Sequence, residues 1–162
     1  MKILVAIEDQ RFGQAIGDFI CEHQWPEDTE IRLVHAVEPI NVYAFSGYPS
    51  QLITDFQEER VRAGKSLLLR IGTQIAKNLP SVPIKETVYD GSPKELIIRL
   101  AREWPADLIV VGSHGRTGIG QFVLGSVSMS VLSAAPCSVM VVKLPKEAQK
   151  ETMPEKETVE AK

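Results

Sequence analysis

The sequence predicts one doubly wound α/β domain, in which a five-stranded parallel sheet carries helices on both faces. Short apolar runs alternate with longer amphipathic stretches along most of the 162 residues, as in a series of βαβ units. The runs at 108–111 (LIVV) and 139–142 (VMVV) contain no polar residue. Uniformly apolar runs are typical of parallel strands that are covered on both faces.

The elements follow from the period of the apolar residues. Strands are expected over 2–8, 30–38, 83–89, 107–112 and 138–143, and helices over 11–24, about 50–78, 93–103 and 126–134. Right-handed crossovers between consecutive strands then produce the doubly wound sheet.

Local signals support two of the helices. Ser92, Pro93 and Glu95 form a predicted capping box with proline at the first helical position. Gly64 and Gly72 lie on the apolar face of the long helix, where glycine costs roughly 1 kcal/mol relative to alanine. We therefore expect that helix to pack closely on the sheet at both glycines.

Composition excludes several classes of function. The net charge is −3 with no basic cluster, so nucleic-acid binding is not expected. The opening apolar run is too short for a signal sequence or a membrane span, and a cytoplasmic location is expected.

The cysteines and histidines do not have the spacing of a metal site or a disulfide framework. Cys21 and Cys137 are isolated, and the histidines form no cluster. His35 lies in an apolar strand and is expected to be a hydrogen-bonded core residue, whereas His23 is expected to be exposed at a helix end.

Two segments fall outside the regular pattern. Residues 39–50 carry three aromatic residues between prolines and could either cover a ligand or pack locally. Residues 145–162 are charged and nearly free of apolar side chains, so we expect a disordered tail after a domain that spans 1–144.

The segment from Gly112 to Ser126 has the pattern G-x2-G-x9-G-S between a strand and a helix. Gly112 and Gly115 allow backbone amides to approach an anion, and the amides of Gly125, Ser126 and Val127 begin a helix, where phosphate is favoured. The hydroxyls of Ser126 and Ser128, and the Arg116 side chain, are additional candidate donors. A plain connection would be shorter and need fewer glycines. The segment is neither a Walker P-loop nor a GxGxxG motif, because the lysine and the spacing are absent.

With ADLIVVGSHG before this loop, the final strand VMVVK, the opening KILVAIE and the central GSPKELI, residues 2–143 resemble the universal stress protein family, specifically its ATP-binding branch. The resemblance implies strand order 3-2-1-4-5, homodimers formed through the last strand (138–143), and ATP held between the ends of the first and fourth strands.

The resemblance also implies a set of nucleotide-binding positions. These are Ala6, Glu8, Ala36, Gly112, Ser113, His114, Gly115, Arg116, Thr117, Gly118, Gly125, Ser126, Val127 and Ser128. The family commonly has Asp-Gly-Ser after the first strand, whereas this chain has Glu8, Asp9 and Gln10. Either Glu8 or Asp9 could therefore take the place of the usual aspartate.

The function expected from these features is that of an ATP-binding, stress-responsive regulatory protein. A slow ATP hydrolase or phosphotransferase is one alternative, although no catalytic base is evident. A dimeric interaction protein that turns over no nucleotide is the other. Mg²⁺ or Mn²⁺ is expected to be held by the phosphates, with no metal site or catalytic residue of the protein's own.

Overall fold

The computed structural model describes residues 1–41, 47–113 and 124–144. Its strands are β1 (Lys2–Ala6), β2 (Glu30–Val37), β3 (Ile84–Asp90), β4 (Leu108–Gly112) and β5 (Ser138–Val142). Its helices are α1 (Gln10–Glu22), α2 (Ser50–Asn78), α3 (Pro93–Glu103) and α4 (Ser126–Ala134). All the predicted elements are present in the described residues, and their ends differ from the predicted ones by two residues at most.

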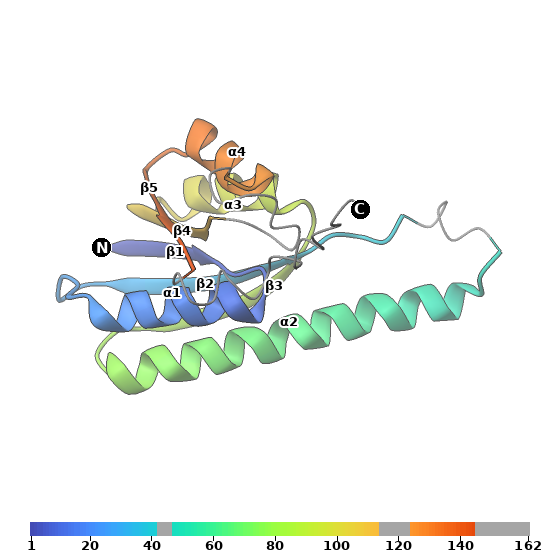
Figure 1. Ribbon diagram of the computed structural model, residues 1–162, viewed down its shortest axis with the longest axis horizontal. Helices are drawn as coiled ribbons and strands as arrows, with labels where there is room; N and C mark the ends of the chain where they lie inside the picture. The colour runs from blue at the N-terminus through green and yellow to red at the C-terminus, as the bar shows by residue number, and fades with distance from the viewer. Residues whose placement is uncertain (42–46, 114–123, 145–162) are drawn as a thin grey trace, which may run out of the picture.

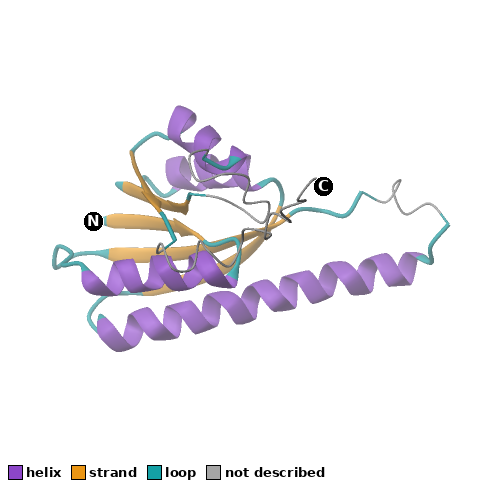
Figure 2. Cartoon of the chain, in the orientation of Figure 1, coloured by secondary structure: helices purple, strands orange, loops and turns teal. Residues whose placement is uncertain are grey.

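The sheet is entirely parallel and has the strand order β3-β2-β1-β4-β5, as predicted. Helices α1 and α2 cover one face and α3 and α4 cover the other (Figures 1 and 2). β1 and β4 lie in the middle of the sheet, and their side chains are almost fully buried on both faces. The apolar run of β4 is therefore explained by two separate cores, one under each pair of helices. The run at 139–142 was also predicted to be covered on both faces, but β5 is an edge strand and only Val142 of this run is fully buried.

The predicted capping box at α3 is only partly correct. Ser92 occupies the N-cap position and Pro93 the first turn, but the Ser92 side chain makes no capping hydrogen bond. The turn is instead made by Gly91, whose φ of +137° lies in the region that favours glycine. Gly91 also donates its amide hydrogen to the carbonyl oxygen of Val37, which holds the start of α3 beside the end of β2.

Helix α2 is 29 residues long and projects beyond the carboxyl ends of the strands (Figure 1). Its buried residues begin only at Gly64. The predicted close packing at the two glycines is confirmed. A Cβ at Gly64 would lie 2.5 Å from Cδ2 of His35, and one at Gly72 would collide with the carboxylate of Glu86.

No helix among the described residues is both long and apolar enough to span a membrane.

Candidate functional site

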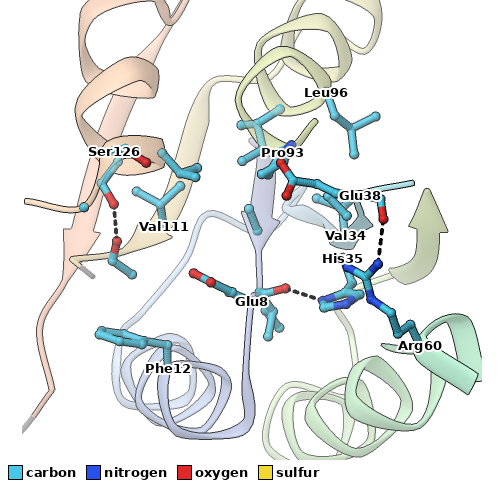
Figure 3. Close-up of a pocket in the computed structure, with 18 residues that line it drawn as sticks. Glu8, Phe12, Val34, His35, Glu38, Arg60, Pro93, Leu96, Val111 and Ser126 are labelled. Carbon is cyan, nitrogen blue, oxygen red and sulfur yellow. Dashed lines mark hydrogen bonds between the residues drawn. The ribbon is translucent and has the colours of Figure 1, made fainter. Parts of the chain in front are cut away.

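A cavity of about 330 Å³ lies at the carboxyl ends of β1, β2 and β4 (Figure 3). This is where open α/β sheets bind their ligands. Residues from three strands and all four helices contribute to it. Its lining consists of Ala6, Ile7, Glu8, Phe12, Val34, His35, Ala36, Glu38, Arg60, Pro93, Leu96, Ile97, Val111, Gly112, Gly125, Ser126, Val127 and Ser128.

The middle of the cavity is apolar. Ala6 and Val34 face it from the ends of neighbouring strands, while Pro93, Leu96 and Ile97 face it from the first turns of α3. Val34, Leu96 and Ile97 are almost completely buried in the protein core. A flat apolar group such as a nucleobase is therefore a suitable ligand for this part of the cavity.

Hydrogen bonds join the two ends of the glycine-rich segment. The Gly125 amide donates to the carbonyl oxygen of Ser113 over 2.8 Å, and the Ser128 hydroxyl donates to that of Gly112 over 2.6 Å. The Ser113 amide in turn donates to the carbonyl oxygen of Val142 over 2.9 Å. These bonds hold the start of α4 against the ends of β4 and β5.

These contacts correct the roles expected of two residues. The Gly125 amide and the Ser128 hydroxyl were expected to donate to phosphate, but in this structure both donate to the backbone. Both residues still line the cavity, together with Ser126 and Val127. Ser126 and Val127 begin α4, which has no side-chain cap. Their N–H groups lie in the first turn of α4, where no carbonyl of the helix can accept from them. They are therefore the donors available to an anion.

The Phe12 ring packs directly on Gly112. A Cβ at Gly112 would lie 2.6 Å from Cδ1 of Phe12, which is closer than real side chains approach each other. Gly112 was predicted as a glycine that exposes its amide to an anion. The structure adds a second reason for glycine at this position, namely the close contact between α1 and the end of β4.

Glu8 and Asp9 differ in their positions relative to the cavity. The Asp9 carboxylate caps α1 by accepting a 2.9 Å hydrogen bond from the Phe12 amide, and Asp9 does not line the cavity. Glu8 is exposed and does line the cavity. Of these two acidic residues, Glu8 is therefore the one that faces the cavity, and its carboxylate is an acceptor for a hydroxyl or amino group.

His35 is a core residue, as predicted. It is only 8% exposed, and its Nδ1 donates to the carbonyl oxygen of Ile7 over 2.8 Å. This bond places the hydrogen on Nδ1 when the ring is neutral. His35 packs between the end of β1 and Gly64 on α2, so the ring forms part of the cavity floor.

Arg60 on α2 lines the cavity and was not among the predicted residues. Its Nη1 donates to the Glu38 carbonyl oxygen over 2.7 Å (Figure 3). Sequence pattern offered no signal for it, because exposed and inward-facing arginines of a long helix look alike. Phe12, Pro93, Leu96 and Ile97 were also missed as lining residues, although the predicted start of α3 would have placed Pro93 at this edge of the sheet.

His114, Gly115, Arg116, Thr117 and Gly118 lie outside the described residues. Within the described ranges there is no group of His, Cys, Asp and Glu side chains that could hold a metal ion. Burial raises the pKa of the Cys21 and Cys137 thiols, with further contributions from nearby carboxylates, and neither cysteine lines the cavity. These thiols are therefore poor candidates for a nucleophile at this site.

The family model for universal stress proteins matches residues 1–143, which is most of the chain. The chain belongs to the universal stress protein family. Among curated relatives of this universal stress protein, "Universal stress protein A homolog 2" of Coxiella burnetii is 35% identical over 144 residues, covering 88% of this chain and 94% of the relative.

Solved structures share the fold of this universal stress protein at lower identity. The hypothetical protein MJ0577 is 21% identical, with a TM-score of 0.77 and coverage of 90% and 96% of the two chains. A family member from Arabidopsis thaliana with AMP bound has a TM-score of 0.66 at 19% identity, covering 91% and 94%. One from Archaeoglobus fulgidus in complex with dAMP has a TM-score of 0.58 at 21% identity, covering 88% and 98%.

Proposed function

We propose that this universal stress protein binds ATP in the cavity at the carboxyl ends of β1, β2 and β4 and acts as a nucleotide-dependent regulatory protein in a cytoplasmic stress response. The observation that carries the proposal is the combination of an apolar cavity with an uncapped helix start. The α4 amides of Ser126 and Val127 would meet phosphate, and the apolar surface of Ala6, Val34 and Leu96 would meet the base.

Support also comes from family members of the same fold that carry AMP or dAMP. In the proposed complex the G-x2-G-x9-G-S segment surrounds the triphosphate, with Arg116 as an additional cation. A Mg²⁺ or Mn²⁺ ion would be held by the phosphates, since the described residues offer no cluster of metal ligands of their own.

The regulatory role rests on the chemistry of the lining. Among the described residues, the cavity contains no cysteine, and its histidine, His35, donates from Nδ1 to the Ile7 carbonyl oxygen and packs its Cδ2 and Nε2 edge against Gly64. Slow hydrolysis would require Glu8, an exposed carboxylate, to activate water. We therefore propose binding without efficient turnover, so that occupancy rather than product formation carries the signal.

We further propose that the protein forms a homodimer through β5. This strand pairs only with β4 among the described strands, and Met129 and Leu132 on the adjoining α4 are exposed. The Val142 carbonyl points to Ser113, so the backbone groups of Val139 and Val141 point away from β4. A second copy of β5 could pair with them. Val141→Pro removes one of these outward N–H groups and should give a monomer in sedimentation experiments that still unfolds cooperatively.

The decisive test of binding is to purify the protein, release bound small molecules by denaturation, and identify them by mass spectrometry. Titration calorimetry with ATP and Mg²⁺ then measures affinity, and the loss of ATP over hours measures turnover. An adenine nucleotide that is bound and remains intact supports the proposal. Rapid ATP loss would favour the hydrolase, and the absence of any nucleotide binding would favour a pure interaction protein.

A further inference from the structure

The cavity has two chemically different ends. The start of α4 follows β4 on one face of the sheet, whereas Arg60 on α2 lies beside the end of β2 on the other face. β1 separates β2 from β4. Ser126 and Arg60 accordingly lie on opposite sides of the cavity in Figure 3. A ligand whose phosphates contact α4 would extend its other end toward Arg60.

Arg60 is held in place by its neighbours. Nη1 donates to the carbonyl oxygen of Glu38 over 2.7 Å and lies 3.4 Å from Oε1 of Gln57. Nε2 of Gln57 donates to the carboxylate of Asp90 over 3.2 Å. These bonds fix the guanidinium at the ends of β2 and β3, where α2 leaves the sheet. The rotamer entropy that a free arginine would lose on binding a ligand is therefore already partly lost.

Part of the guanidinium remains available. An arginine donates from Nε, Nη1 and Nη2, and the hydrogen bonds above use Nη1 only. Nε and Nη2 have no partner among the described residues. Because Arg60 lines the cavity, these groups can meet an acceptor on a ligand. Guanidinium donates only and stays charged, so the ligand atom must be an acceptor.

We propose that Arg60 contacts the base of the bound nucleotide and donates to one of its ring nitrogens. This inference rests on the proposed function, because it takes the phosphates to lie at α4. The apolar surface of Ala6 and Val34 would cover the face of the base, and Arg60 would recognise its edge. The charged Glu38 side chain, which also lines this end, would accept from an amino group on the same edge.

The test combines a change in the protein with a change in the ligand. Calorimetric titrations compare the wild type and Arg60→Gln with ATP, 1-deaza-ATP, 3-deaza-ATP and 7-deaza-ATP. Each deaza analogue lacks one ring nitrogen. We expect one analogue to bind the wild type about tenfold more weakly than ATP, as for loss of a charge-assisted hydrogen bond. In Arg60→Gln that penalty should disappear, because the donor is absent.

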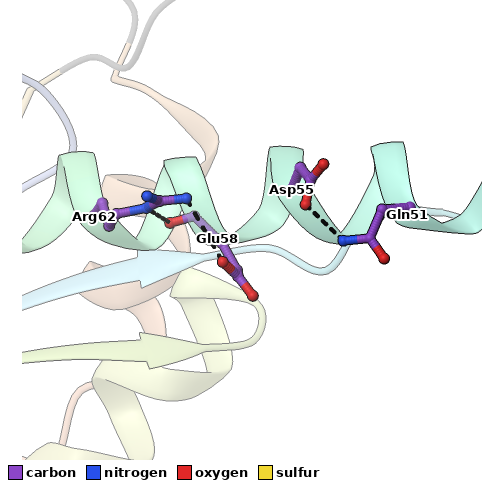
Figure 4. Close-up of polar contacts among 4 residues, drawn as sticks. All are labelled: Gln51, Asp55, Glu58 and Arg62. Carbon is purple, nitrogen blue, oxygen red and sulfur yellow. Dashed lines mark hydrogen bonds and ion pairs between the residues drawn. The ribbon is translucent and has the colours of Figure 1, made fainter.

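Arg62→Gln is the matched control. Arg62 lies on the same helix but pairs with Glu58 on its exposed side, over 3.6 Å (Figure 4). This variant should bind ATP and all three analogues as the wild type does. Arg60→Lys is a second variant that keeps the charge and can still donate to Glu38, yet loses the planar guanidinium. It should also abolish the penalty while leaving the melting temperature close to that of the wild type.

Two results would overturn the inference. One is that Arg60→Gln still binds the same deaza analogue about tenfold more weakly than ATP. The other is that Arg60→Gln weakens the binding of inorganic tripolyphosphate as much as the binding of ATP. That result would mean that Arg60 contacts the phosphates rather than the base. Failure of the proposed function is a separate result, since a wild type that binds neither ATP nor tripolyphosphate would contradict nucleotide binding itself.

Discussion

The hydroxyl of Ser128 donates a 2.6 Å hydrogen bond to the carbonyl oxygen of Gly112, joining the first turn of α4 to the last residue of β4. Ser128 is only 4% exposed. Since Gly112 precedes the glycine-rich segment and Ser128 follows it, this bond fixes the distance between the two ends of that segment.

Ser128→Ala is therefore expected to destabilise the protein and to weaken ATP binding. The half-buried carbonyl of Gly112 would lose its donor, which costs about 1–2 kcal/mol in the free energy of unfolding. Urea unfolding measures this cost and calorimetry measures the affinity. Ser133→Ala is the control, because its exposed hydroxyl donates to the carbonyl oxygen of Met129 within the same helix and to no other residue that the structure describes. If both variants have the same stability, the Ser128 bond does not stabilise the ends of the segment.

Gly112→Ala should be destabilising for a steric reason that depends on Phe12. Gly112 does not have a positive φ, so alanine is not excluded by backbone conformation. Its Cβ would instead lie 2.6 Å from Cδ1 of Phe12, and overpacking of this kind costs about 1–3 kcal/mol.

A double-mutant cycle in urea tests this explanation. In a Phe12→Ala background, the cost of Gly112→Ala should fall to below about 0.5 kcal/mol, because the ring is gone. An equal cost in both backgrounds would show that the glycine is needed for something other than its contact with Phe12.

The sheet and the place of the cavity could be predicted because they follow from strong local patterns. The apolar run at 108–111 reflects burial on both faces of β4, and the glycine-rich segment marks the connection after β4. Gly64 and Gly72 were correctly predicted as close-packing positions. In each case the residue type itself indicates the environment, since apolar residues mark buried strand positions and glycines mark places where another group packs close to the backbone.

The roles of several cavity residues could not be predicted, because they depend on contacts between distant elements. Arg60 meets Glu38 across 22 positions of sequence, and Phe12 meets Gly112 only after α1 packs on the sheet. The Gly125 amide is used by Ser113, a bond that the general preference of helix starts for anions does not reveal. Spacing marked out the glycine-rich segment that ends beside the cavity, but not which of its donors the protein itself uses.

Replacement of Gly125 tests the phosphate-binding role of the start of α4. Gly125 has φ −60° and ψ 156°, which any residue adopts, and its amide can still donate to Ser113 after substitution. Alanine and valine are both poor N-cap residues, so the two variants should lose similar stability, about 1 kcal/mol. They differ in bulk beside the Ser126 and Val127 amides.

We therefore expect Gly125→Val to bind ATP at least about tenfold more weakly than Gly125→Ala. Calorimetry at matched temperature and Mg²⁺ concentration gives the two affinities, and urea unfolding checks that stability is equal. If the valine variant bound ATP as tightly as the alanine variant does, the phosphates would not lie at this helix start.

The last prediction concerns pH and the contact between β3 and α2. Glu86 points from β3 toward α2, where its carboxylate lies against the backbone of Gly72. Glu86 is exposed as a whole, but partial desolvation of its carboxylate beside α2 raises its pKa above the usual value of 4.5. The folded state therefore binds this proton more tightly than the unfolded state does. The stabilisation that this tighter proton binding gives is fully present below the pKa that Glu86 has in the unfolded chain. It is lost as the pH rises through the higher pKa that Glu86 has in the folded protein.

Glu86→Gln removes this dependence, because the amide stays neutral at every pH. The variant should differ least from the wild type below about pH 4 and should become the more stable protein as the pH approaches neutrality. Thermal unfolding from acid to neutral pH measures the difference in melting temperature. Glu27→Gln, at an exposed position before β2, serves as the control and should show no such trend. A difference for Glu86→Gln that does not change with pH would mean that the carboxylate is as well solvated in the folded protein as in the unfolded chain.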